Sequence, residues 1–331
     1  MSVAPVVHDE RRHAHCVRGE IVSQGSAGTA GSGDPLKSGR RVRYIRDEIV
    51  PSAQRMVLGN ALCSRRTAIG LKQEEVARLL GASKSKVSRI ETGQHQLKEQ
   101  DLAQFFVIYR ITDPLEQGQL RELAEEANQQ PWWQAWSGVA SKHLQAVVSF
   151  EDMAQRIRVY EPLQLPGLLQ TESYARAVIA GGSADVHHRQ ALVDLRMERR
   201  QRFQSAGADK KLICVLDEGS LRRRYGTPRV MQHQLEHLVD LASTPRYLIR
   251  IAEQDRYDLP VHIGSTTIWE FSARILPDIA YAEVYDGGLI FQDEEQVDKR
   301  KKAFDRLRGA SLSPQRSIQR LKHLLSSGYY R

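Results

Sequence analysis

The length of 331 residues allows two modest domains, each with a core of its own. A hydrophobic fraction of 41% and a charged fraction of 27% are typical of a soluble globular protein, and no apolar stretch approaches the roughly 20 residues of a membrane span. The first residues lack the apolar core of a secretory signal, so we expect none. The three cysteines, Cys16, Cys63 and Cys214, lie far apart, which favours reduced thiols in the cytoplasm.

The net charge of +8 is concentrated in one segment of the chain. Residues 37–110 hold fifteen Lys or Arg and seven Asp or Glu, an excess of +8, so the rest of the chain is neutral overall. A cationic segment on an otherwise neutral protein is typical of binding to a polyanion. An ordinary solvated basic surface explains the charge equally well, so the residue pattern has to decide.

Four regions follow one another along the chain. Residues 1–39 are poor in apolar side chains and rich in Gly and Ser, which predicts a disordered tail. Residues 40–112 predict a helical domain, and residues 113–149 predict a helical connector with a tryptophan-rich segment. Residues 150–331 mix helical and strand patterns and predict a second domain.

Residues 71–93 carry the pattern of two short helices joined by a tight turn. Apolar residues at helical spacing give each helix a buried face: Val76 and Leu80 in the first, Val87 and Ile90 in the second. Gly81 suits the positive φ of the turn, and Ser83 suits the cap of the second helix. This arrangement places the second helix, residues 83–92, in the major groove of DNA. The alternative is an ordinary helical hairpin with a basic outer face.

Residues 57–109 resemble the helix-turn-helix domain of the phage repressors and their bacterial, XRE-type relatives, with the highest specificity over residues 73–93. The resemblance implies a five-helix bundle that binds double-stranded DNA as a homodimer. The residues that fit the first and last helices of the bundle are apolar: Leu58, Leu62, Leu102, Phe105 and Phe106. Arg65 departs from the apolar residue usual at its position, so the packing of the first helix is harder to predict.

The resemblance and side-chain chemistry together select the DNA-binding residues: Gln73, Ser83, Lys84, Ser85, Lys86, Ser88 and Arg89. In the family, the residue at the place of Gln73 touches a phosphate. Arg89 can bond guanine O6 and N7 with both arms of its guanidinium, whereas Lys84 is a flexible point charge. Ser85 is short and discriminates less between bases, and Lys86 points sideways, toward a phosphate.

The second region predicts an α+β domain with a mainly antiparallel sheet, so the fold class is α+β with the all-α bundle first. Strand patterns lie at residues 212–216, 247–251, 266–271, 281–285 and 289–291. Asp286 and Gly287 favour a tight hairpin between the last two strands. Helical patterns lie at residues 229–241 and 297–326, with a break near 311–314, and Thr171 suits the cap of a short helix.

The segments PGLLQTESYARA and LDEGSLRRRYG, at residues 166–177 and 216–226, resemble the C-terminal domain of the WhiJ-like regulators of actinobacteria. In that group this domain is regarded as regulatory, and many members are encoded beside a very small companion protein in a layout compared with toxin–antitoxin pairs. The resemblance implies an antitoxin-like regulator whose C-terminal domain binds a small protein. It implies no catalytic residue.

Three other groups of residues suggest different chemistry. His233 and His237 have the spacing of two zinc ligands, but no third ligand is evident, so an ordinary amphipathic helix is favoured. Four acids near strands could form an acid–base pair, although salt bridges to the arginines at 222–224 are favoured: Asp217, Glu218, Glu270 and Glu283. Trp132, Trp133 and Trp136 could stack on a ligand, but burial at the domain junction is favoured.

The sequence therefore predicts a cytoplasmic transcription regulator, associated with the nucleoid when bound to DNA, with no enzymatic activity, cofactor, metal or membrane contact. Control is expected through residues 150–331, by a small protein partner or a ligand. The alternative is a DNA-tethered enzyme whose C-terminal domain acts on a small substrate. A deep pocket with a perturbed acid or histidine would favour the enzyme, and a broad apolar patch would favour the regulator.

Overall fold

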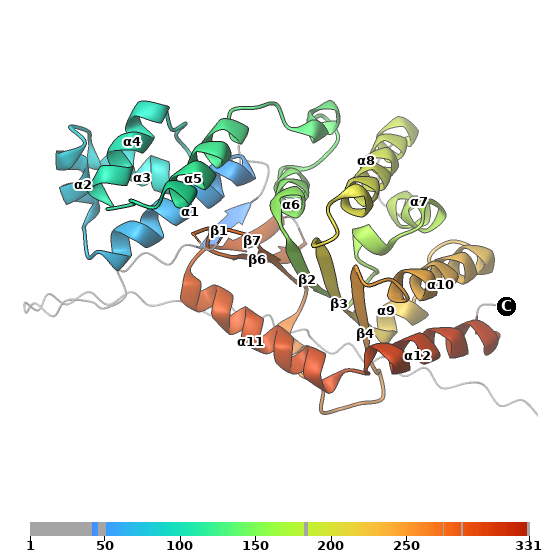
Figure 1. Ribbon diagram of the computed structural model, residues 1–331. Coiled ribbons are helices and arrows are strands. Elements are labelled where there is room, and N and C mark those ends of the chain that lie inside the picture. The colour runs from blue at the N-terminus through green and yellow to red at the C-terminus, as the bar shows by residue number, and fades with distance from the viewer. Residues whose placement is uncertain (1–41, 46–50, 182–184, 274, 286, 330–331) are drawn as a thin grey trace, which may run out of the picture. The chain divides into compact units, whose positions relative to one another are not determined.

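A computed structural model describes residues 42–45, 51–181, 185–273, 275–285 and 287–329 (Figure 1). These residues belong to one compact unit of the chain, Arg40–Arg331. The tail expected at residues 1–39 lies outside the described residues, and so does Asp286 of the expected hairpin. In the described part of the chain, no helix combines the length and the apolar character that crossing a membrane requires.

Five helices form the N-terminal bundle, the number that the resemblance implies: α1 (Ala53–Ala68), α2 (Gln73–Leu79), α3 (Lys84–Glu91), α4 (Glu99–Ile108) and α5 (Pro114–Glu126). The last of them is α5, which lies in the segment expected to be a connector, and not the helix that holds Leu102, Phe105 and Phe106. Side-chain caps fix where several of these helices begin; Ser52 accepts from the amide of Arg55 and Asp113 from that of Leu115. The five apolar residues that the resemblance places in the bundle are all buried. Arg65 donates from Nε and Nη2 to Glu116 of α5, at 3.0 and 2.7 Å, so a charge in α1 ties the two helices together.

The C-terminal domain is built on a seven-stranded sheet with the order β1-β7-β6-β5-β2-β3-β4. Its strands are β1 (Val42–Ile45), β2 (Arg156–Glu161), β3 (Lys211–Asp217), β4 (Tyr247–Ala252), β5 (Thr266–Glu270), β6 (Ile279–Val284) and β7 (Gly287–Phe291). The β2–β3 and β3–β4 pairs are parallel and the other four are antiparallel. The expected α+β class with a mainly antiparallel sheet is confirmed.

Helices cover both faces of this sheet, and short 3-10 turns connect them. The α-helices are α6 (Lys142–Met153), α7 (Glu172–Ala180), α8 (Val186–Ser205), α9 (Glu218–Arg222), α10 (Pro228–Ala242), α11 (Glu294–Ala310) and α12 (Pro314–Ser326). The 3-10 turns are η2 (Trp132–Trp136), η3 (Gly167–Leu169) and η4 (Val261–Ile263). Thr171 caps α7, and the chain breaks between α11 and α12 where the sequence predicts it.

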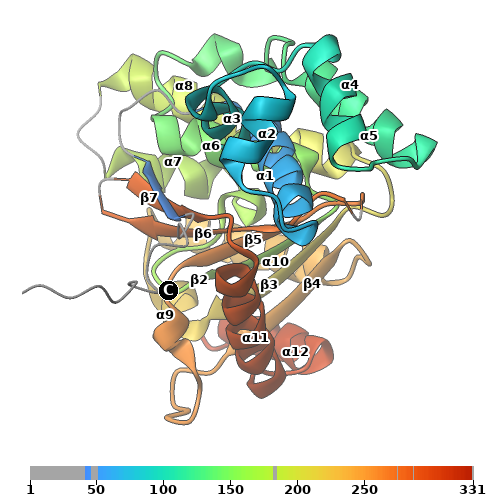
Figure 2. The same cartoon turned by 90° about the vertical axis from the view of Figure 1, so that its left-hand side faces the viewer.

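The alternation of residues along β2 shows how the two faces are filled. Ile157 and Val159 point into the larger core, which α6, α8 and α10 also enter, whereas Tyr160 points into a smaller core. The smaller core receives Phe304 and Leu307 from α11. Figures 1 and 2 accordingly show α11 on the face of the sheet opposite to α6. The helices α6 and α8 therefore cover one face of the sheet, and α11 covers the other.

Candidate nucleic-acid interface

The turn between α2 and α3 has the geometry that the sequence predicts. Gly81 adopts a φ of 61°, which any residue with a Cβ would find strained. The amide of Ala82 donates to the carbonyl of Ala77 at 2.8 Å and closes the end of α2. Ser83 then caps α3, its Oγ accepting from the amide of Lys86 at 3.1 Å. These local bonds set the angle at which α3 leaves α2.

The two faces of α3 differ as expected. Val87 and Ile90 are buried against the bundle. The predicted DNA-binding residues of α3 lie on the other side of the helix; Lys84, Ser85 and Arg89 are exposed, and Lys86 and Ser88 are half-buried. The helix therefore presents a polar outer surface, here called the reading surface, which consists of these five residues.

Acids from the neighbouring helices neutralise two of the three cations on α3. Lys84 pairs with Glu74 of α2, and this bond lowers the pKa of the Glu74 carboxyl. Lys86 does not point freely toward solvent, because its Nζ donates to both carboxylate oxygens of Asp101 on α4, at 3.0 and 3.2 Å. Within the described residues, Arg89 is the α3 cation that no acid pairs with. Its guanidinium is thus the group on this surface most available to DNA.

Gln73 takes part in a buried network behind the reading surface. As the first residue of α2, it donates its side-chain amide to Glu91 Oε2 at 2.7 Å. The Glu91 side chain is fully buried and also accepts from Arg66, at 2.5 Å from Nε and 3.1 Å from Nη2. Burial alone would lower the pKa of Arg66, but the bond to Glu91 raises it overall. The three residues join α1, the start of α2 and the end of α3, and sequence reasoning missed Glu91 and Arg66.

Two glycines allow the end of α3 to lie close to α1. A Cβ on Gly59 of α1 would overlap the carbonyl oxygen of Ile90 and lie 2.7 Å from that of Glu91. Gly93, just after α3, has a φ of 73°, and a Cβ there would lie 2.8 Å from the amide nitrogen of Met56. Backbone packs directly on backbone here, so the position of α3 is fixed with little tolerance.

The edge of the sheet contacts this same end of the recognition helix. Arg43 of β1 donates from Nη2 to the carbonyl of Thr92, the C-cap residue of α3, at 2.9 Å. Gln292, which follows β7, donates to the carbonyl of Met56 in α1 at 3.2 Å. Because β1 pairs with β7, both contacts come from one edge of the sheet. β1 was not predicted from the sequence, because a strand of four residues, Val-Arg-Tyr-Ile, is too short to show a pattern.

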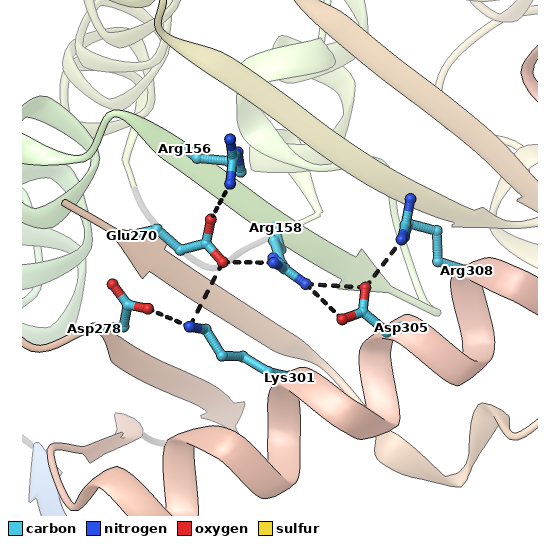
Figure 3. A network of polar contacts seen from close by, with 7 residues as sticks. All are labelled: Arg156, Arg158, Glu270, Asp278, Lys301, Asp305 and Arg308. Carbon is cyan, nitrogen blue, oxygen red and sulfur yellow. Dashed lines mark hydrogen bonds and ion pairs between the residues drawn. The ribbon is translucent and has the colours of Figure 1, made fainter. Parts of the chain in front are cut away.

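Three of the four candidate acids are held by structural bonds. Glu270 pairs with Arg156 and Arg158, at 3.0 and 2.7 Å, in the network of Figure 3. In that network Arg158 also donates to both oxygens of Asp305, which ties β2 to α11. Glu218 pairs with Arg222 and Arg320, and Asp217 accepts a hydrogen bond from the hydroxyl of Tyr160. The salt bridge from Glu218 to Arg222 is as the sequence predicts, whereas Glu283 lines a cavity.

The histidine pair on α10 and the tryptophans of η2 are the remaining candidates for a metal site and a stacking site. His233 and His237 lie on α10, and burial lowers the pKa of His237. Across the described ranges, no three His, Cys, Asp or Glu side chains gather as a metal would need. The tryptophans of η2 are half-buried, contrary to the expected burial. One of them, Trp133, donates from Nε1 to Ser149 Oγ at 2.7 Å, so α6 anchors this segment.

Comparison with known proteins divides the chain into two matched regions. Residues 57–117 match a family described as a helix-turn-helix domain, and residues 144–323 match a family described as a domain of unknown function, DUF5753. No curated protein and no solved structure matches the chain. The first match agrees with the α2–α3 geometry and marks a DNA-binding regulator. The second covers more than half of the sequence, and the chain therefore belongs to the DUF5753 domain family, with a helix-turn-helix DNA-binding domain before it.

Proposed function

We propose that this protein regulates transcription by binding specific DNA sites with α3 in the major groove. The observation that carries the proposal is the exposure of the Arg89 guanidinium. It lies on the reading surface, and no acid among the described residues pairs with it. Such a group bonds guanine in a two-armed geometry. Lys84 and Lys86 are held by Glu74 and Asp101, so they meet DNA only if they exchange these partners for phosphate or a base.

The other candidate residues have supporting roles in this proposal. Ser85 and Ser88 lie beside Arg89 and offer hydroxyls to a base edge or a phosphate. Ser83 caps α3, and Gln73 is the first residue of α2, where the resemblance places a phosphate contact. The resemblance to the phage repressors also implies a homodimer. A homodimer with two-fold symmetry would bind a pseudo-palindromic DNA site.

Replacing Arg89 by alanine tests the assignment of the reading surface. We expect Arg89→Ala to cost about 1–3 kcal/mol on the specific site and to relax the preference at one base pair, because one two-armed contact to a base is lost. Site selection from a random DNA pool, followed by titration of the selected site, measures both effects. The control is Lys86→Ala, which should weaken binding to all sequences alike. Unchanged base preference in Arg89→Ala would contradict the assignment.

We further propose that the C-terminal domain controls DNA binding, through a small protein partner or a ligand. The contact from Arg43 to Thr92 supports this, since it joins the sheet to the end of the recognition helix. A positively charged guanidinium near the C-terminal end of a helix also interacts favourably with the negative end of the helix dipole. A change in the position of β1 or β7 would therefore alter how firmly α3 is held. The resemblance to the WhiJ-like regulators favours a small companion protein as one such input.

The contact of Arg43 predicts a measurable loss when it is removed. Arg43→Met should keep an aliphatic stem against α3 but lose the bond to Thr92, because methionine has no donor. We expect faster amide exchange at the C-terminal end of α3 and about 3- to 10-fold weaker DNA binding. Exchange measured by mass spectrometry on the full chain is the readout. Arg89→Ala is the control, since it should weaken DNA binding without changing exchange, and equal exchange in both variants would exclude the coupling.

A further inference from the structure

A cavity of about 180 Å³ lies within the C-terminal domain, between the sheet and the helices α6 and α8. Its apolar walls come from α6, β2 and η3: Leu144, Val147, Ile157, Val159 and Leu168. Drug-sized ligands occupy pockets of roughly 300–1,000 Å³, so this cavity suits a smaller metabolite. Its polar groups limit the chemistry of that metabolite.

Arg196 of α8 brings a positive charge to this cavity. Its Nη1 donates to Gln170 Oε1 at 2.8 Å, and no carboxylate of the described residues is within ion-pair distance of it. The neighbouring Arg199, by contrast, is bound by both oxygens of Glu151, at 2.9 and 2.7 Å. Burial, together with the charge of Arg199, lowers the pKa of Arg196 to about 10. Arg196 is therefore a half-buried cation that no acid of the described residues holds in an ion pair, although the charges of Glu283 and Glu151 favour its charged form from farther away.

Glu161, at the end of β2, brings a negative charge to the same cavity. Its Oε1 accepts from Ser265 Oγ at 2.6 Å, and no cation of the described residues pairs with it. Burial raises the pKa of Glu161 to about 7, and the nearby Glu283 adds to this against the bond from Ser265. The cavity wall thus carries charges of both signs with no ion pair between Arg196 and Glu161, and burial disfavours the charged form of each.

Tyr281 of β6 adds a buried hydroxyl without a partner. The side chain is 3% exposed and lines the cavity, and its hydroxyl finds no hydrogen-bond partner among the described residues. Its ring lies over Gly288 of β7, where a Cβ would overlap the ring. A buried hydroxyl without a partner costs free energy, and a molecule in the cavity that supplied the missing bond would recover it.

We propose that this cavity binds a small zwitterion, an α-amino acid with an apolar side chain. Arg196 receives its carboxylate, Glu161 and Glu283 receive its ammonium group, and the apolar wall receives its side chain. A carboxylate alone would leave the repulsion between Glu161 and Glu283 in place, and an amine alone would leave Arg196 without an ion pair. The inference rests on the proposed function, because it names the class of ligand through which the C-terminal domain acts.

Calorimetric titration of the full chain, without DNA, tests this binding directly. The probes are L-leucine, L-valine, L-methionine and L-phenylalanine, together with the two halves of leucine, 4-methylpentanoate and 3-methylbutylamine. We expect at least one amino acid to bind, and each half of leucine to bind about 10- to 100-fold more weakly than leucine if leucine is the ligand. No binding by any of the four amino acids would overturn the proposal, and so would a half that binds as tightly as its parent.

Matched variants separate a binding role from a structural one. Tyr281→Phe should weaken amino-acid binding by about 3- to 10-fold while the melting temperature stays the same or rises, since the hydroxyl finds no partner among the described residues. Its control is Tyr160→Phe, which removes a hydroxyl bonded to Asp217 at 2.9 Å and should lower the melting temperature without changing binding. A Tyr281→Phe protein that binds as tightly as the wild type would remove the hydroxyl from the site.

The charge on α8 has its own matched pair. Arg196→Met should weaken binding by about 10- to 100-fold. Arg202→Met, on the same helix, should leave binding unchanged because its guanidinium lies over the ring of Trp132. Equal binding in Arg196→Met and wild type would overturn the proposal.

DNA titrations with and without the amino acid separate this inference from the proposed function. Binding that leaves DNA affinity unchanged would keep the site and exclude its control of DNA binding. Absence of amino-acid binding, with DNA binding still weakened in Arg43→Met, would remove the site and keep the coupling. A perturbed acid in a cavity also fits the alternative of an enzyme, so the amino acid is recovered and analysed after incubation. Recovery of the unchanged amino acid supports its role as a regulatory ligand, whereas conversion of the amino acid to another compound would overturn that role.

Discussion

Replacing Glu91 by alanine should lower the stability of the helical bundle by about 3–5 kcal/mol, because it removes one partner of a buried ion pair and leaves the other behind. The Arg66 side chain is 13% exposed and would keep its charge with no carboxylate beside it. Gln73 would also lose the acceptor of its amide at the start of α2. Since Glu91 is the last residue of α3, we expect the recognition helix to lose its fixed position as well.

Urea unfolding of the full chain, combined with amide exchange in α1 and α3, measures this loss. The matched control is Glu99→Ala, in the same bundle, which breaks the exposed pair with Arg121 and should cost less than about 1 kcal/mol. The double replacement Arg66→Met with Glu91→Leu should recover most of the stability, because no charge is then left buried. Equal losses in Glu91→Ala and Glu99→Ala would contradict the role of burial.

Local signals explain why the helix-turn-helix is predictable from sequence. The turn depends on one glycine with positive φ, and the start of α3 depends on one serine cap, so each is determined by a residue at the place where it acts. The burial of Val87 and Ile90 follows from their spacing alone. The acids that neutralise Lys84 and Lys86 come from α2 and α4, and the sequence of α3 contains nothing that shows them.

Long-range pairing explains what the sequence did not reveal. β2 has the sequence Arg-Ile-Arg-Val-Tyr-Glu, and the two arginines by themselves suggest a solvated surface. In the fold, α11 and β5 provide the acids that pair with them. β1 has four residues, and its pairing partner lies about 250 positions later in the chain. The charges of the cavity, Glu161 and Arg196, come from different elements, so their meeting depends on the fold and not on spacing.

Substituting alanine for Gly59 should destabilise the protein by about 3 kcal/mol and weaken DNA binding, although alanine is the better helix former. The added Cβ would overlap the carbonyl of Ile90, and backbone atoms, unlike a flexible side chain, cannot move aside at low cost. Either α3 shifts away from α1 or the bundle opens, and both change the angle at which Arg89 meets the groove.

Gly118 provides the matched control for Gly59. It lies in α5, it is exposed, and a Cβ there would meet nothing within 4 Å. Gly118→Ala should therefore stabilise the bundle by about 0.5–1 kcal/mol through helix propensity, with unchanged DNA affinity. If α1 and α3 approach each other this closely, thermal unfolding shows stability changes of opposite sign in the two variants, and DNA titration shows weaker binding in Gly59→Ala alone. A Gly59→Ala protein as stable as Gly118→Ala would mean that α3 does not pack on the backbone of α1, and the fixed angle of the recognition helix would then need another cause.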